Sequence, residues 1–169
     1  MNADDLRQLQ NPLKDRYRVD PASAVVTLHA DGELTGTDVS CTVQTFAGPV
    51  EAGLHPATGG DGSLACSGDM LLEALVACAG VTLRAVATSM GMEIRGGTAR
   101  AEGDLDFRGT LGVDKAAPVG FETIRLTFAL DTDADAKQLE ALRRLTERYC
   151  VVAQSLRTAP TIEVTARTG

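Results

Sequence analysis

The sequence has few aromatic residues and no excess of positive charge. It contains no tryptophan, two tyrosines and four phenylalanines among 169 residues, and its formal net charge at pH 7 is −7. Proteins that bind single-stranded nucleic acid stack the bases on aromatic side chains and attract the phosphates with lysine and arginine. An acidic chain also repels anionic membrane surfaces. We therefore expect neither a nucleic acid nor a membrane as partner.

The chain also lacks an apolar signal segment near its first residue and an uninterrupted run of membrane-spanning length. Residues 1–20 are polar and charged, unlike a secretory signal peptide. The longest apolar stretch, about residues 70–87, contains Glu73 and Arg84 as well as many small residues. Such a stretch is typical of a buried helix rather than a membrane span. These patterns predict a cytoplasmic protein.

Closely spaced cysteine pairs are absent as well. The four cysteines stand at positions 41, 66, 78 and 150. In a reducing cytoplasm, cysteines serve redox chemistry or metal binding more often than a disulfide scaffold. A structural metal site needs pairs such as Cys-x-x-Cys, and the sequence has none. We therefore expect redox chemistry and no bound metal.

The length predicts one domain, residues 21–169, preceded by a polar N-terminal arm, residues 1–20. In the arm we expect a helix over residues 4–10 that ends at Pro12. Alternating apolar residues around Asp31-Gly32 predict a hairpin with its turn at that dipeptide. Further strands are expected in residues 38–46, 92–107, 121–132 and 160–167, and helices in residues 67–90, 133–149 and 150–159. This order places the chain in the α+β class.

The helix of residues 67–90 has clear end signals and an unusual pattern. Ser67 is suited to the N-cap, and Gly91 to the position after the last turn. Apolar residues cover nearly every face, which indicates a helix enclosed on all sides. Because a small domain cannot wrap a helix completely, we infer that a second subunit contributes to the enclosure.

Two other segments show one apolar face. Apolar and polar residues alternate over residues 121–132, and residues 133–149 have an amphipathic helical pattern. The shared faces consist of Ile124, Leu126, Phe128 and Leu130 in the strand, and of Leu139, Leu142, Leu145 and Tyr149 in the helix.

Two cysteines stand in contexts that allow either packing or reactivity. Cys78 lies in the middle of the apolar run "ALVACAGVTL", where a thiol is most often a small buried hydrophobe. Cys150 follows one predicted helix and begins another. At a helix N-terminus, unpaired amides and the helix dipole lower the pKa of a thiol and favour the reactive thiolate.

The contexts of both cysteines resemble the two signature regions of the OsmC/Ohr family of osmotically inducible and organic-hydroperoxide-resistance proteins. The first region is "SGDMLLEALVACAGVTLRAVATSMGMEI", similar to the family's Leu-Leu-x-Ala-Leu-x-x-Cys helix. The second is "FETIRLTFALDTDADAKQLEALRRLTERYCVVAQSL", similar to the family's Tyr-Cys-Pro-Val turn after an amphipathic helix. The resemblance extends over about residues 20–166.

The resemblance implies an OsmC-like fold, in which antiparallel sheets wrap a buried central helix that carries Cys78, within an intertwined homodimer. It also implies a thiol peroxidase of organic hydroperoxides in oxidative stress defence. Cys78 would be the peroxidatic thiol and Cys150 the resolving thiol, joined in a Cys78–Cys150 disulfide. No metal, haem or other cofactor is implied, and the reductant would be an external dithiol, typically a lipoyl group on a protein.

The chain departs from the family pattern at three positions. The hydroperoxide-resistance branch has an arginine before the Asp-Gly turn and a glutamate at the helix start, where this chain has Ala30 and Gly68. The proline that follows the second cysteine in the family is Val151 here. The sequence therefore does not identify the group that activates Cys78.

Three other residues are candidates for supporting roles. Asp69 stands in the first turn of the central helix and is also suited to capping it. Arg84 lies six residues after Cys78, where a dimer interface is an alternative role. Cys66, in the preceding loop, is an alternative resolving thiol or a bystander. The missing Arg–Glu pair also keeps a second function open: a module without efficient peroxidase activity that binds a hydrophobic small molecule or acts as a thiol redox sensor.

Overall fold

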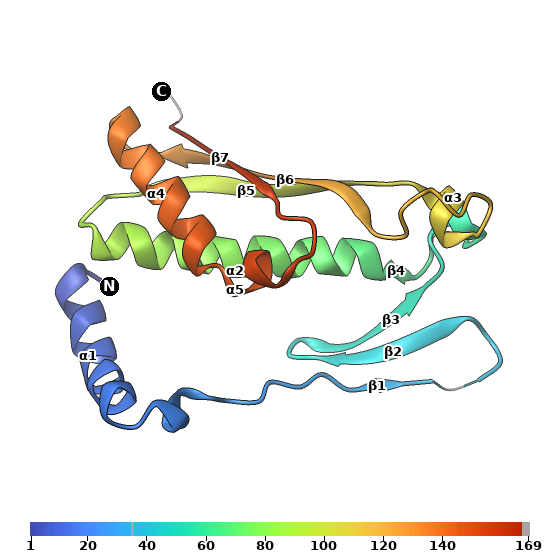
Figure 1. The fold of residues 1–169 in the computed structure, drawn as a ribbon, viewed down its shortest axis with the longest axis horizontal. Coiled ribbons are helices and arrows are strands. Elements are labelled where there is room, and N and C mark those ends of the chain that lie inside the picture. Colours follow the sequence, from blue (N-terminus) through green and yellow to red (C-terminus); the bar gives the residue numbers. More distant parts are fainter. Residues whose placement is uncertain (35, 167–169) are drawn as a thin grey trace. The chain divides into compact units, whose positions relative to one another are not determined.

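The computed structural model describes residues 1–34 and 36–166, and these form an α+β fold as expected. The helices are α1 (Ala3–Val19), α2 (Ser67–Ser89), α3 (Phe107–Thr110), α4 (Ala136–Tyr149) and α5 (Val151–Ser155). The strands are β1 (Gly32–Glu33), β2 (Ser40–Thr45), β3 (Gly48–Gly53), β4 (Ala65–Cys66), β5 (Gly96–Leu105), β6 (Phe121–Asp131) and β7 (Thr161–Ala166). Two short 3-10 turns, η1 (Pro21–Ala24) and η2 (Pro56–Thr58), complete the described elements (Figure 1).

The residues group into two compact units. The larger unit comprises residues 1–26, 74–103 and 123–166 and holds α1, most of α2 and β5, β6, β7, α4 and α5. The smaller unit comprises residues 27–73 and 104–122 and holds β1 to β4 and α3.

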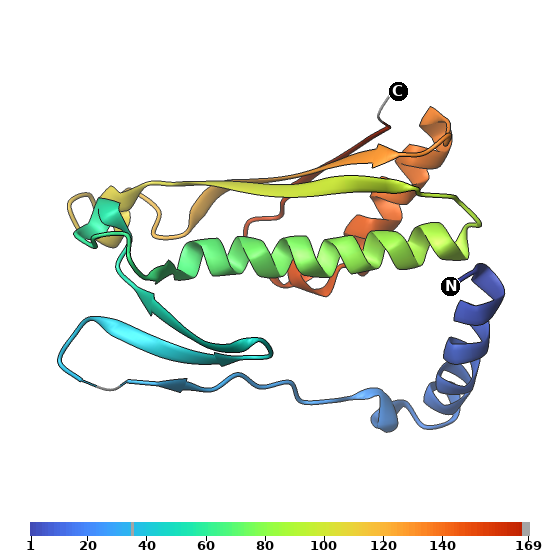
Figure 2. The ribbon, with the colours of Figure 1, turned by 180° about the vertical axis from the view of Figure 1, so that it is seen from behind.

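In the larger unit, a three-stranded sheet in the order β5-β6-β7 lies along α2 (Figures 1 and 2). β6 and β7 are parallel, with Leu126 opposite Ile162. β3 and β4, in the smaller unit, are parallel as well. Antiparallel sheets had been expected, and for these two pairs that expectation is wrong. β6 and β7 are parallel because α4 and α5 form the crossover connection between them, so that β7 runs in the same direction as β6.

The core of the larger unit forms where α2 and α4 meet this sheet. The predicted apolar face of β6 is confirmed, because all four of its residues are at most 4% exposed. The buried residues of α2 are Leu75, Ala79, Leu83, Val86 and Ala87. On α4, Leu142 and Thr146 are fully buried, whereas Tyr149 is 57% exposed. The apolar face predicted for α4 is therefore wrong at Tyr149. The buried positions follow a spacing of four residues, and the next one after Thr146 is Cys150, directly after the helix.

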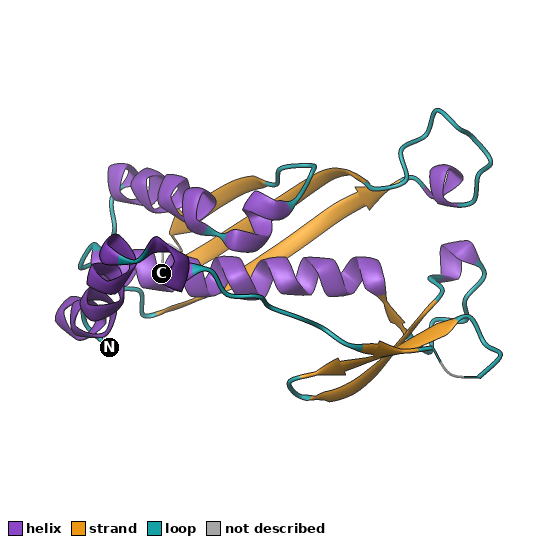
Figure 3. Cartoon of the chain, turned by 60° about the horizontal axis from the view of Figure 1, so that its bottom comes forward, coloured by secondary structure: helices purple, strands orange, loops and turns teal. Residues whose placement is uncertain are grey.

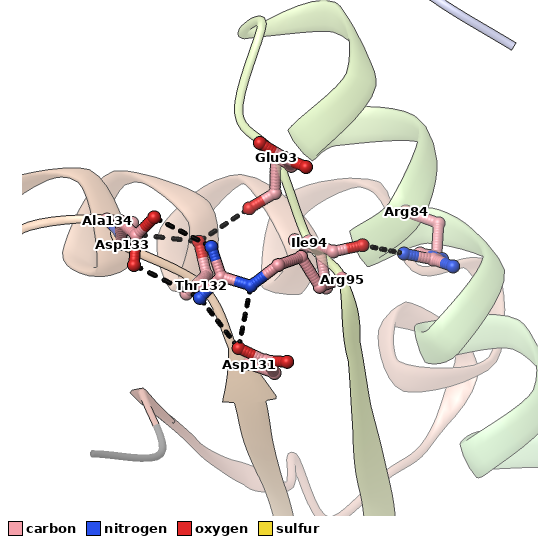
Figure 4. Close-up of polar contacts among 8 residues, drawn as sticks. All are labelled: Arg84, Glu93, Ile94, Arg95, Asp131, Thr132, Asp133 and Ala134. Atoms are coloured by element: carbon pink, nitrogen blue, oxygen red, sulfur yellow. Dashed lines mark hydrogen bonds and ion pairs between the residues drawn. The ribbon is translucent and has the colours of Figure 1, made fainter. Parts of the chain in front are cut away.

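The end of α2 was predicted correctly. Gly91 has a φ of 68°, a left-handed conformation that favours glycine. Its N–H donates to Thr88 O (3.1 Å), and the N–H of Met92 donates to Ala87 O (2.9 Å), the two bonds of a Schellman motif. Beyond this turn, the Arg95 side chain donates to the carboxylates of Asp131 and Asp133 (both 2.7 Å), which joins the start of β5 to the end of β6 (Figure 4).

The smaller unit contains the four-stranded sheet β1-β2-β3-β4 (Figure 3). Its tight hairpin joins β2 to β3, with Thr45 opposite Gly48. The hairpin expected at Asp31-Gly32 is wrong, because Gly32 itself begins β1 and pairs with Val43. Every buried residue among those that the structure describes lies in the larger unit. The smaller unit therefore has no buried core of its own.

The N-terminal helix is longer than expected. α1 begins with a capping box between Asn2 and Asp5 and continues through Pro12 to Val19, so the expected end at Pro12 is wrong. Proline has no N–H, which removes one hydrogen bond from the helix but does not stop it here. No residue of α1 is buried.

α2 is not enclosed within the single chain, and its enclosure by a second subunit stays a prediction. Val81 is 72% exposed and Leu71 is 38% exposed. Only 28% of the most apolar 18-residue stretch of α2 is buried. By length and composition alone, α2 could cross a membrane, although its sequence was interpreted as typical of a buried helix rather than a membrane span. That is weak evidence for a membrane, since core helices of soluble proteins have the same composition.

Candidate functional site

Cys78 and Cys150 meet in the larger unit. Cys78 lies in the middle of α2, and Cys150 is the residue between α4 and α5. The two thiols lie close enough to shift each other's pKa, and both cysteines are free. Cys150 is fully buried, whereas Cys78 is only half-buried. A molecule arriving from solvent therefore reaches Cys78 first.

The local sequence places Cys150 at a sharp change of direction. α4 starts with a capping box between Asp135 and Gln138, and the Cys150 N–H donates to Thr146 O (3.0 Å) at its end. Cys150 itself is extended, with φ −74° and ψ 107°, so the helix cannot continue. The N–H of Gln154 then donates to Cys150 O (3.0 Å), the first bond of α5.

The surroundings of Cys78 favour its thiolate. Burial raises the pKa of the Cys78 thiol, but hydrogen bonds from four groups lower it, and the net pKa lies below the ordinary value. In order of size, the donors are the N–H of Val152, the thiol of Cys150, the N–H of Val151 and the hydroxyl of Thr82. None of these donors is a charged side chain.

The surroundings of Cys150 favour its neutral thiol. Burial raises the pKa of Cys150, and the neighbouring Cys78 sulfur raises it further through its hydrogen bond and its negative charge. The N–H groups of Ala153 and Val152 lower this pKa but do not outweigh the increase. The helix N-terminus was expected to lower the pKa of Cys150 itself, and that expectation is wrong.

The two thiols therefore differ in how readily they ionise. As the pH rises, Cys78 loses its proton first, and Cys150 keeps its proton as a hydrogen-bond donor. A half-buried thiolate next to a buried thiol is the arrangement that a nucleophile and a second, resolving thiol require.

The three candidates for supporting roles lie elsewhere. Cys66 ends β4 and Asp69 stands exposed in the first turn of α2, both in the smaller unit. Arg84 donates to the carbonyl oxygen of Ile94 (2.8 Å), which fixes its guanidinium at the turn after α2 (Figure 4). It is not among the principal groups that shift the pKa of Cys78. Participation of these three residues in chemistry stays a prediction.

Sequence reasoning missed the groups that act on Cys78. Thr82 follows Cys78 by four residues, and a helix places such residues on the same face, so this signal was available. The N–H groups of Val151 and Val152 carry no such signal, because every residue except proline has one. Only the folded position of α5 directs them to this sulfur.

Comparison with known protein families places this site in context. Residues 60–165, more than half of the chain, match the model of the OsmC-like protein family. The chain belongs to the OsmC-like family. The matched range includes both Cys78 and Cys150, as the signature regions had indicated. Comparison with curated proteins gives no match.

Solved structures show the same OsmC-like fold. A hypothetical protein from Aquifex aeolicus superposes with a TM-score of 0.66 at 18% identity, covering 85% of this chain and 98% of that one. An organic hydroperoxide resistance protein OsmC from Legionella pneumophila gives a TM-score of 0.64 at 17% identity, covering 85% and 100%. The organic hydroperoxide resistance protein OhrB of Bacillus subtilis gives 0.57 at 17% identity, covering 83% and 98%. At these identities the likeness shows the fold alone.

Proposed function

We propose that this OsmC-like protein is a thiol peroxidase that reduces organic hydroperoxides to alcohols through Cys78 and Cys150. The observation that carries the proposal is the pair of neighbouring free thiols with opposed pKa shifts, lowered at the half-buried Cys78 and raised at the buried Cys150. The organic hydroperoxide resistance proteins among its structural neighbours point to the same class of substrate.

The first step is a nucleophilic attack by Cys78. Its thiolate attacks the distal oxygen of the hydroperoxide, an S–O bond forms and the O–O bond breaks. The leaving alkoxide takes a proton from the Cys150 thiol and departs as the alcohol. Cys78 is oxidised to a sulfenic acid, and Cys150 becomes a thiolate.

The second step closes the disulfide. The Cys150 thiolate attacks the sulfur of the Cys78 sulfenic acid, an S–S bond forms, and the oxygen leaves as hydroxide. An external dithiol, such as a lipoyl group on a protein, then reduces the disulfide by thiol–disulfide exchange and is itself oxidised. The cycle needs no metal or other cofactor.

Peptide mapping under non-reducing conditions tests this proposal. The fully reduced protein receives one equivalent of cumene hydroperoxide, with hydrogen peroxide as a parallel control. We expect a Cys78–Cys150 disulfide that forms faster with the organic peroxide, because an apolar site favours the apolar substrate. A Cys78 that stays reduced at this dose contradicts the proposal.

One feature of the larger unit favours a second candidate function, the binding of a hydrophobic small molecule by a chain without efficient peroxidase activity. A cavity of about 310 Å³ opens between α2 and the β5-β6 face, and its lining includes Leu83, Phe128 and Leu130. Apolar cavities of this size hold small ligands. The same peptide mapping separates the peroxidase from a binding module, because a binding module does not form the disulfide on treatment with the organic peroxide. A redox sensor forms the disulfide but does not consume excess hydroperoxide when a dithiol reductant is present.

We further propose that the protein is a homodimer. The exposed apolar residue Val81 on α2 and the absence of a buried core in the smaller unit both leave apolar surface uncovered. Leu34, Val39 and Phe46 of the smaller unit are at least 72% exposed. Exposed apolar surface of this extent is typical of a protein–protein interface, and a second copy of the chain would cover the same surface on both partners.

Val81→Asp is expected to weaken such a dimer, because it places a carboxylate on the apolar face of α2. Sedimentation velocity of the wild type should give a dimer, and the variant should shift towards the monomer by a factor of about ten or more in dissociation constant. Val113→Asp, at a valine that is 74% exposed outside α2, is the matched control and should remain dimeric. A monomeric wild type at micromolar concentration contradicts the proposal.

A further inference from the structure

Thr146 carries a buried hydroxyl that has no hydrogen-bond partner. The residue lies in the last turn of α4 and is fully buried. Among the residues that the structure describes, its Oγ1 is the one buried side-chain nitrogen or oxygen atom that forms no hydrogen bond. A buried hydroxyl without a partner lowers stability, and valine has nearly the same shape without this cost. Stability alone therefore does not explain the hydroxyl at position 146.

The usual acceptor for a threonine hydroxyl in a helix is the carbonyl oxygen one turn earlier. Thr88 of α2 follows this rule, because its Oγ1 donates to Arg84 O (2.8 Å). The equivalent carbonyl for Thr146 belongs to Leu142, and Thr146 Oγ1 forms no bond to it. The hydroxyl of Thr146 is therefore available to a group outside the backbone of its own helix.

Thr146 and Cys150 lie one helical turn apart on the same buried face. Both are 0% exposed, and the Cys150 N–H donates to Thr146 O (3.0 Å). The φ of Cys150, −74°, is close to the helical value and keeps its Cβ in the helical direction. Side chains four residues apart on a helix are neighbours, with about 5–6 Å between their Cβ atoms. Threonine has two favoured χ1 settings in a helix, so a rotation about χ1 is sufficient to bring the hydroxyl to the Cys150 sulfur.

We propose that Thr146 is a positioning residue for the resolving step, and that its hydroxyl donates a hydrogen bond to the Cys150 sulfur after that thiol has lost its proton. In the structure Cys150 is free, and a neutral thiol is a weak acceptor. A buried thiolate, by contrast, requires a donor. The inference rests on the proposed peroxidase function. Thr146 keeps its proton throughout, while the electron pair of the Cys150 sulfur forms the S–S bond and hydroxide leaves Cys78.

Thr146→Val removes the hydroxyl and keeps the shape of the side chain. After one equivalent of cumene hydroperoxide, we expect the sulfenic acid of Cys78 to accumulate, because the buried Cys150 thiolate has lost a donor. Dimedone traps the sulfenic acid, and peptide-resolved mass spectrometry measures it beside the Cys78–Cys150 disulfide. The ratio of trapped sulfenic acid to disulfide should rise about tenfold over that of the wild type.

Two control variants separate this role from a structural one. Thr146→Ser restores the hydroxyl and should restore the wild-type ratio. Thr132→Val removes a buried hydroxyl that has a partner, since Thr132 is 6% exposed and its Oγ1 donates to Glu93 O (2.6 Å). This variant should unfold at a lower urea concentration and keep the wild-type ratio. Thr146→Val should show the opposite pattern, with an altered ratio and no loss of stability.

A second measurement needs no peroxide. In reduced protein labelled with ¹³C at the cysteine Cβ atoms, the Cys150 resonance reports its ionisation. Cys78 is the titratable group that acts on Cys150, and it is the same in every variant compared. The titration midpoint of Cys150 should rise by about one pH unit in Thr146→Val, the same factor of ten, and return to the wild-type value in Thr146→Ser.

An unchanged midpoint in Thr146→Val, or an unchanged ratio of sulfenic acid to disulfide, overturns the inference. If the midpoint rises but the wild type forms neither the sulfenic acid nor the disulfide with cumene hydroperoxide, the contact between Thr146 and Cys150 stands and the peroxidase function is wrong.

Discussion

Replacing Cys78 by serine is expected to abolish the reduction of cumene hydroperoxide, with a loss of more than about a thousandfold in rate. A serine hydroxyl stays protonated at neutral pH, so the four hydrogen-bond donors around position 78 have no anion to stabilise. The consumption of hydroperoxide in the presence of a dithiol reductant measures this loss.

Cys41→Ser is the matched control for this substitution. Cys41 is a free, half-buried thiol on β2 in the smaller unit, and its removal should leave the rate close to that of the wild type. Equal losses in the two variants, or full activity in Cys78→Ser, would show that Cys78 is not the nucleophile.

Leu126→Ala is expected to destabilise the larger unit by about 2–5 kcal/mol, because it leaves a cavity where the fully buried side chain was. Leu126 lies at the centre of β6, opposite Ile162 of the parallel strand β7, so the surrounding sheet cannot easily collapse onto the space. Urea denaturation followed by circular dichroism measures the change in the free energy of unfolding.

Thr127→Ala tests the neighbouring residue on the other face of the same strand. Thr127 is exposed, and its replacement should change the free energy of unfolding by less than about 1 kcal/mol. A comparable loss in both variants would mean that the alternation of β6 does not define the core.

Local sequence patterns were sufficient to predict an element correctly where that element has one buried face or a distinctive terminal residue. The four apolar residues of β6 are buried because successive side chains of a strand point to opposite faces, and this period is visible in the sequence. Gly91 ends α2 in a left-handed turn that few other residues adopt easily. These features depend on neighbours along the chain.

Local patterns failed where distant partners decide the structure. The alternation before Asp31-Gly32 predicted a hairpin, but β1 pairs with β2 and the tight turn lies after Thr45. The parallel pairing of β6 with β7 follows from the crossover through α4 and α5, which no alternation reveals. At the end of α4, the buried position is Cys150 and not Tyr149, because the buried residues Leu142, Thr146 and Cys150 follow one another at a spacing of four.

The sequence by itself determined the α+β class, the family and the two cysteines that carry the proposed chemistry. Only the tertiary structure decided which of the two thiols has the lowered pKa and which groups lower it. The sequence placed a helix N-terminus beside Cys150 and suggested that its own pKa would fall. In the fold, the amides of Val151 and Val152 act on Cys78 instead, and the pKa of Cys150 rises. The physical reason is that backbone N–H groups are the same in every residue except proline, so their effect depends on where the fold directs them.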